Sequence, residues 1–233
     1  MEIKAFEIMN QPPTLPNIPK LAWSAEATRN PYATWEYDDF EEYFKPRGLS
    51  VGDIKWLSNQ IEISVEIVEK VPHTGLPDKR DLPELSRFMS SLLRALSFAH
   101  SHFITNNDIA KRNVRYDKET GTTYLFDWSD MRIYKQDGTT YLNPFVSMEP
   151  PEARDIDLPV HVTVSAFDVY SAGVMLNKIL CGYAECDNDD AVLKSDKSNM
   201  LWQAHDLANK LMTQDPFERP SAADMLNHEF LLQ

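Results

Sequence analysis

The chain has 233 residues, enough for one domain or for two small lobes that share a hydrophobic core. Its 23 basic and 36 acidic residues give a formal net charge of −13, which disfavours nonspecific binding to nucleic acid or to an anionic membrane. Two cysteines do not form a disulfide framework, and the first ten residues lack the apolar core of a signal peptide. We therefore expect a cytoplasmic or nuclear protein that is not secreted and binds neither nucleic acid nor membrane.

Residues 1–72 carry few clear signals for regular structure. Gln11–Pro19 is rich in proline and must be an extended connector. Ser50–Val71 fits two patterns, because apolar residues recur at helical spacing from Ile54 to Val68, whereas Ile61–Ile67 alternates as a strand does. We favour a strand for the half that is rich in β-branched residues.

A long amphipathic pattern from Leu82 to His102 predicts the first well-defined helix. Its apolar residues form a wide face that should be buried: Leu82, Leu85, Phe88, Met89, Leu92, Leu93, Leu96 and Phe98. The helix leads into a loop that carries Asp108. His100 is interpreted as a packed structural histidine, because no cysteine or carboxylate cluster lies near it in the sequence.

The stretch from Phe103 to Ser129 carries the clearest chemistry in the chain. Asp108 lies in a short predicted loop, and Asn113 follows five residues later at the start of a β-type run. A second β-type run, Thr122–Phe126, leads directly to Asp127. Two carboxylates and an amide displayed in this way can hold Mg²⁺ against polyphosphate oxygens while Asp108 orients a nucleophilic hydroxyl.

These motifs resemble those of the eukaryotic-type protein kinase superfamily. Asp108-Ile-Ala-Lys-Arg-Asn113 is similar to the catalytic loop H-R-D-x-x-x-x-N, and Asp127-Trp-Ser129 lies where the family has D-F-G. Pro150-Pro-Glu152 resembles A-P-E, Asp168–Gly173 resembles the start of the family's buried central helix, and Asp215–Ala222 resembles the end of its large lobe.

The resemblance implies an α+β, protein-kinase-like fold. Residues 1–72 would form a reduced, β-containing N-terminal lobe. Residues 73–233 would form a mostly helical C-terminal lobe. The cofactors that the family uses are ATP and Mg²⁺, so we expect both wherever nucleotide binding is retained.

The resemblance also implies roles for single residues. Asp108 would be the catalytic residue that orients the acceptor hydroxyl, and Lys111 or Arg112 would steady the transferred phosphoryl group. Asn113 and Asp127 would bind Mg²⁺ and, through it, ATP.

Three further residues would brace the large lobe. Glu152 and Arg219 would form a buried ion pair, and Asp168 would bind the backbone of the catalytic loop. These are scaffold residues, so their presence supports the fold and not turnover.

The chain departs from the family pattern at several positions. The His and Arg before the catalytic Asp are Asn106 and Asn107, and the Lys of Ser/Thr kinases is replaced by Ala110. There is no G-x-G-x-x-G hairpin in the sequence. Lys4 is a candidate for the family's ATP-contacting strand lysine, with Glu26 as its helix partner; alternatively, Lys4 is an ordinary surface lysine.

Three functions compete on this evidence. We expect a protein-kinase-like protein with impaired or absent catalysis, a pseudokinase, that acts by binding a protein partner or by regulation. The alternative is an active ATP- and Mg²⁺-dependent protein kinase that phosphorylates Ser/Thr or Tyr hydroxyls of a protein substrate. A third function is a small-molecule kinase of the aminoglycoside or choline type, which Asp127–Asp130 resembles but Pro150-Pro-Glu152 and Arg219-Pro do not.

Overall fold

The structure is a computed structural model of the whole chain, and its described part comprises residues 21–26, 45, 64–68, 74–128, 131–133, 150–154, 160–181 and 199–232. The chain divides into two compact units. The smaller unit is Lys20–Glu69, and the larger one combines Met1–Pro19 with Lys70–Gln233. The predicted lobe boundary at residue 72 stays a prediction.

The smaller unit contains an antiparallel pair of strands. β1 (Leu21–Glu26) pairs with β2 (Ser64–Val68), and the register shifts between Leu21 and Trp23. The strand predicted for the β-branched half of Ser50–Val71 is therefore confirmed. The helix predicted around Glu26 is wrong, because Glu26 is the last residue of β1 and pairs with Ser64. Lys4 lies outside the described residues.

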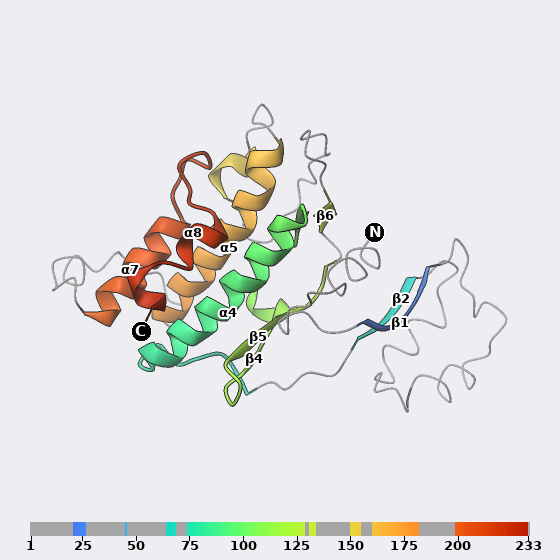
Figure 1. Cartoon of the computed structure of the whole chain (residues 1–233), viewed down its shortest axis with the longest axis horizontal. Helices are drawn as coiled ribbons and strands as arrows, with labels where there is room; N and C mark the ends of the chain where they lie inside the picture. The colour runs from blue at the N-terminus through green and yellow to red at the C-terminus, as the bar shows by residue number, and fades with distance from the viewer. Residues whose placement is uncertain are drawn as a thin grey trace. The chain divides into compact units, whose positions relative to one another are not determined.

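The larger unit is built around α4 (Leu82–Ser101), as the amphipathic pattern predicts (Figure 1). The helix begins after Asp81, whose side chain accepts a hydrogen bond from the Glu84 N–H and so satisfies one of the unpaired donors of the first turn. Most of its apolar face is fully buried, namely Leu85, Phe88, Met89, Leu92, Leu93, Leu96 and Ala99. Leu82 and Phe98, which belong to the predicted face, are half-buried. Burial of this face on other elements, more than helix propensity, stabilises a helix of this kind.

A β-hairpin packs on α4, and it begins directly after Asn113 and ends shortly before Asp127. β4 (Val114–Asp117) pairs with β5 (Thr122–Leu125), and Gly121 takes the left-handed conformation that the turn between them requires. The Thr123 hydroxyl donates to the Phe88 carbonyl of α4 at 3.0 Å. β3 (Ile104–Thr105), just before the loop, pairs with β6 (Arg132–Ile133).

Two further long helices complete the core of the larger unit. α5 (Val160–Cys181) packs on α4 and on α7 (Met200–Leu211), and α8 (Ala222–Met225) packs on α4 (Figure 1). Short 3-10 helices lie at η2 (Lys111–Asn113), η3 (Pro151–Arg154) and η4 (Glu229–Leu231). Among the described helices, none has a stretch both long and apolar enough to cross a bilayer.

Candidate active site

The buried carboxylate of Asp168, on α5, holds the loop that carries Asp108. Asp168 accepts the Asn107 N–H at Oδ1 (2.7 Å) and the Asn106 N–H at Oδ2 (2.9 Å). His100 Nε2 lies 2.9 Å from the same Oδ2, so the histidine at the end of α4 shares this anchor. Asp168 is completely buried. Asp168 thus contacts the loop backbone and His100 together, as the proposed scaffold role of Asp168 requires.

Asn106 links the loop to the segment that contains Asp127. Its Oδ1 accepts the Asp108 N–H at 3.0 Å, and its Nδ2 donates to the Asp127 carbonyl at 3.0 Å. From the sequence, Asn106 is only a departure from the family's His, and this bridging role was not predicted. The bond from the Asp108 N–H could have been expected, because an Asn side chain commonly accepts the backbone N–H two residues later, as in an Asx-turn.

The carboxylate of Asp108 is buried and held by two side chains. Arg112 Nη2 donates to Oδ1 at 2.8 Å and to Oδ2 at 2.6 Å. Asn113 Nδ2 donates to the Asp108 carbonyl at 2.9 Å and to Oδ2 at 2.5 Å. The one-turn helix η2 brings all three residues together, so hydrogen bonds from a cation and an amide fix the carboxylate. Lys111, also on η2, is exposed.

Asp127 lies beside Asn113 at the end of the hairpin. The Phe126 N–H donates to the Asn113 carbonyl at 2.9 Å, which extends the β4–β5 ladder by one step. Asp127 itself is exposed and has a φ of 53°, a left-handed conformation that is uncommon outside glycine. The next residue, Trp128, is fully buried and its Nε1 donates to the Leu125 carbonyl, which anchors the segment.

The donor set at this position fits Mg²⁺. The side-chain Nδ2 of Asn113 donates to Asp108. The side-chain oxygen Oδ1 is therefore the atom of this amide that could bind a cation. Asp127 adds an exposed carboxylate. Carboxylate and amide oxygens are the hard ligands that Mg²⁺ takes, normally as one or two protein ligands together with substrate phosphates.

The predicted ion pair between Glu152 and Arg219 is present and buried. Arg219 Nη1 lies 2.5 Å from Glu152 Oε1, and Nη2 donates to Oε2 at 2.9 Å. The same guanidinium donates to the carbonyls of Ala166 (2.9 Å) and Thr213 (2.8 Å). Through these contacts it joins η3, α5 and the segment before α8. This pair braces the scaffold and is not part of the loop that carries Asp108.

A second buried network fixes β4 against α4. The Tyr116 hydroxyl donates to Glu84 Oε1, and Arg87 donates to Glu84 Oε2 at 2.9 Å. Burial tends to raise the pKa of Glu84, but the hydrogen bonds from Tyr116 and Arg87 and the charges of Arg87 and Lys118 outweigh it and lower the pKa. Burial and the bond to Glu84 raise the pKa of Tyr116.

Comparison with known proteins identifies the family model that fits this chain. The model described as "Protein kinase domain" matches residues 59–231. The chain is 25% identical over 154 residues to serine/threonine-protein kinase pim-2 of Danio rerio, and 26% identical over 226 residues to serine/threonine-protein kinase PLK4 of Drosophila virilis. These alignments cover 63% and 76% of this chain, but 47% and 28% of the relatives. The chain therefore spans less than half of the length of either relative.

Solved structures show the same fold. The autoinhibited serine kinase domain of the giant muscle protein titin superposes with a TM-score of 0.62 at 20% sequence identity. The match covers 100% of this chain and 66% of the titin chain. The α+β, kinase-like fold expected from the motifs is confirmed.

Proposed function

The chain belongs to the protein kinase family, and from this premise we propose that it is a pseudokinase, with impaired phosphoryl transfer, that acts by binding a protein partner. Kinases hold and align ATP almost entirely by positioning and electrostatics, so the loss of a few contacts costs most of the rate.

The contact between Arg112 and Asp108 carries the proposal. A general base must accept a proton, and Arg112 Nη2 donates to both oxygens of the Asp108 carboxylate. An acceptor hydroxyl would have to compete with this guanidinium for the same two oxygens. The sequence adds two departures: Asn106 and Asn107 replace the family's His and Arg, and no two of the 7 glycines are two residues apart, so the glycine-rich pattern is missing.

The alternative is an active Ser/Thr or Tyr protein kinase, and one observation favours it. Asp108, Asn113 and Asp127 are all retained, and Asn106 together with the β4–β5 ladder holds them near one another. In this alternative Asn113 and Asp127 would hold Mg²⁺, which neutralises charge on the phosphates of ATP. Arg112 would turn away from Asp108 toward the transferred group, and Lys111 would steady the same group.

Thermal unfolding of the full chain with ATP, with and without Mg²⁺, tests the proposal. A ligand at about 100 times its Kd stabilises a protein by roughly 2.7 kcal/mol, which is readily seen as a melting shift. We expect no Mg²⁺-dependent shift at millimolar ATP. Asp127→Asn should then melt in the same way as the wild type whether or not ATP and Mg²⁺ are present.

Asp78→Asn is a matched control for this experiment, because Asp78 is exposed and its pairing partner is the neighbouring Arg80. A Mg²⁺-dependent shift that Asp127→Asn abolishes and Asp78→Asn keeps would support the alternative. Transfer of radiolabelled phosphate to generic protein substrates would then decide whether binding leads to turnover. Measurable transfer that depends on Asp108 would overturn the proposal.

A further inference from the structure

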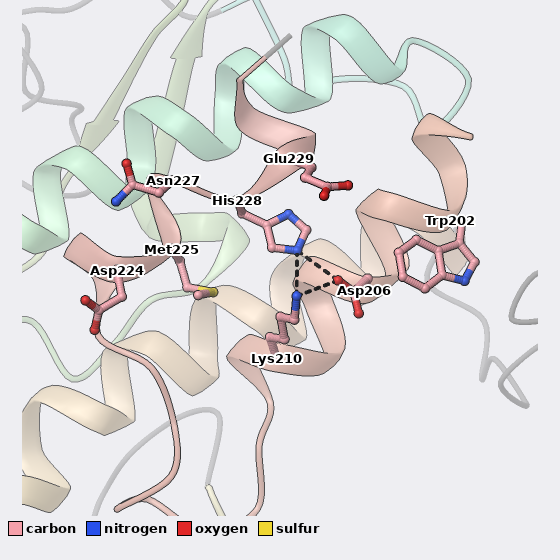
Figure 2. A pocket seen from close by; sticks show the side chains of 8 residues that line it. All are labelled: Trp202, Asp206, Lys210, Asp224, Met225, Asn227, His228 and Glu229. Carbon is pink, nitrogen blue, oxygen red and sulfur yellow. Dashed lines mark hydrogen bonds and ion pairs between the residues drawn. The ribbon is translucent and has the colours of Figure 1, made fainter. Parts of the chain in front are cut away.

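A pocket of about 440 Å³ lies between α7 and the segment that joins α8 to η4 (Figure 2). Trp202, Asp206 and Lys210 line it from α7, where their four-residue spacing puts them on one face. Asp224, His228 and Glu229 line it from the other side. We call it the α7–η4 pocket. None of the candidate active-site residues lines it, so it needs an explanation of its own.

One side of the α7–η4 pocket is a charge cluster that is already paired. Asp206 Oδ2 lies 2.8 Å from Lys210 Nζ and 3.0 Å from His228 Nε2 (Figure 2). Lys210 Nζ is also 3.4 Å from His228 Nε2, and the Phe230 nitrogen is 3.3 Å from His228 Nδ1. Within this cluster the Asp206 carboxylate offsets the charge of Lys210.

Burial tends to raise the pKa of Asp206, but the hydrogen bonds from Lys210 and His228 outweigh it and lower the pKa. Hydrogen bonds from Ser221 lower the pKa of Asp224 as well. Both side chains are therefore anions at neutral pH.

Besides the Asp206–Lys210 ion pair, the lining contains two further carboxylates, those of Asp224 and Glu229. Glu229 is exposed, and Gln203 Nε2 donates to its Oε2 at 3.4 Å. Asp224 is also exposed, and its two bonds from Ser221 both go to Oδ2. The lining holds three carboxylates and one ammonium, a formal net charge of −2 with His228 counted as neutral, in a chain whose formal charge on the same count is −13. Such a pocket repels anions and favours a cation.

The aromatic side chain in the lining, Trp202, favours one class of cation. Trp202 lines the pocket as a half-buried indole, and a cation is attracted to an aromatic ring. A guanidinium stacks on aromatic rings and matches a carboxylate with its planar set of donors, which an ammonium does not do. We propose that the α7–η4 pocket binds an arginine side chain from a basic segment of a partner protein. This inference deepens the binding part of the proposed function, yet it requires no nucleotide.

Fluorescence anisotropy with the full chain tests the proposal. The probes are three labelled peptides of one Gly-Ser background that carry two arginines, two lysines or two glutamates. We expect the arginine peptide to bind most tightly and the glutamate peptide not at all. Glu229→Gln and Trp202→Ala should each weaken binding of the arginine peptide by about two- to fivefold, as for exposed ion pairs and cation–π contacts. Added NaCl should weaken binding further.

Glu119→Gln is the matched control, because it removes the same charge from an exposed position in the β4–β5 turn, away from the pocket lining. It should leave the affinity of the arginine peptide unchanged, and Glu229→Asp should retain most of it. An equal loss in Glu119→Gln and Glu229→Gln would mean that only the overall charge attracts the peptide, and would overturn the proposal. So would equal affinity for the glutamate peptide, or no binding of the arginine peptide at millimolar concentration.

Melting temperatures establish that the variants are folded, and Glu229→Gln alone decides the question if Trp202→Ala does not fold. The result is also separable from the nucleotide experiment. Arginine-peptide binding without an ATP shift supports both proposals, whereas Asp108-dependent phosphate transfer without peptide binding overturns both. Asp108-dependent transfer together with Glu229-dependent peptide binding removes the pseudokinase assignment alone.

Discussion

At the scale of single residues, Arg219 joins three segments through one buried guanidinium. It donates to Glu152 and to the carbonyls of Ala166 and Thr213, and it lies 4.9 Å from the ring centroid of Tyr170. We expect Arg219→Met to lower the free energy of unfolding by about 3–5 kcal/mol, because the Glu152 carboxylate is then buried without its partner. Glu152→Gln should cost less, since the guanidinium keeps both carbonyl acceptors. Urea unfolding of the two variants measures this order, and the reverse order would contradict it.

Glu84 makes stability depend on pH. Its pKa is lower in the folded state than in the unfolded chain, where it is about 4.3. A carboxyl of this kind stabilises fully above the unfolded pKa, and the contribution disappears as the pH falls through the folded value. We therefore expect Glu84→Gln to show a shallower loss of stability than the wild type as the pH falls below about 4.3.

Urea midpoints across this acidic range measure the effect of Glu84→Gln. Glu119→Gln serves as the control, because Glu119 is exposed and should leave the pH dependence of the wild type unchanged. The assignment fails if Glu84→Gln retains the full acid dependence of the wild type.

At the scale of elements, the contact between α5 and α7 depends on Gly173. A methyl group there would lie 2.7 Å from Leu211 Cβ and 2.8 Å from Met212 Cγ. Because Leu211 Cβ is fixed by its helix backbone, α7 would have to move. We expect Gly173→Ala to destabilise by about 1–3 kcal/mol, even though alanine gains about 1 kcal/mol in helix propensity.

Chemical unfolding of Gly173→Ala measures this cost. Adding Met212→Ala should recover only part of it, since the clash with Leu211 Cβ persists. A Gly173→Ala variant more stable than the wild type would show that the two helices are not in close contact.

The sequence predicted helices and strands correctly where the local pattern of apolar or β-branched residues was strong. α4 follows directly from its apolar stripe, and β2 followed from its β-branched residues even though a helical stripe competed with them. Glu26 was misplaced on a helix because its position was inferred from a distant likeness at Lys4 and not from local periodicity. A strand that pairs across more than 35 residues leaves little local signal, since its stability comes from the partner strand.

The sequence named candidate site residues but not their contacts. Asp108 and Asn113 are in direct contact, and Asp127 is joined to the same loop through Asn106, because the loop and hairpin that display them are short. The engagement of Asp108 by Arg112 and the bridge made by Asn106 depend on side-chain directions, which no spacing rule specifies.

At the scale of the whole molecule, the net charge of −13 and a pI of about 4.8 imply self-repulsion in the compact state. We expect the melting temperature to rise by a few degrees as NaCl increases toward physiological ionic strength, where the Debye length is about 8 Å. KCl should give the same rise if screening is the cause. A fall in melting temperature over the same range would mean that surface ion pairs outweigh the repulsion.

The anchoring of the loop by Asp168 has a consequence for how this chain changes over generations. Asp168 is buried and bonds to the backbone of residues 106 and 107, so its loss impairs folding whatever the protein does. Selection for a folded product is therefore enough to keep the loop in shape. In a deep mutational scan read out by cellular abundance, substitutions at Asp168 should be depleted, while exposed Asp127 should be depleted less, with Asn and Gly tolerated best because of its positive φ. The conformation of a catalytic loop can in this way be conserved as part of the fold, whether or not the protein catalyses a reaction.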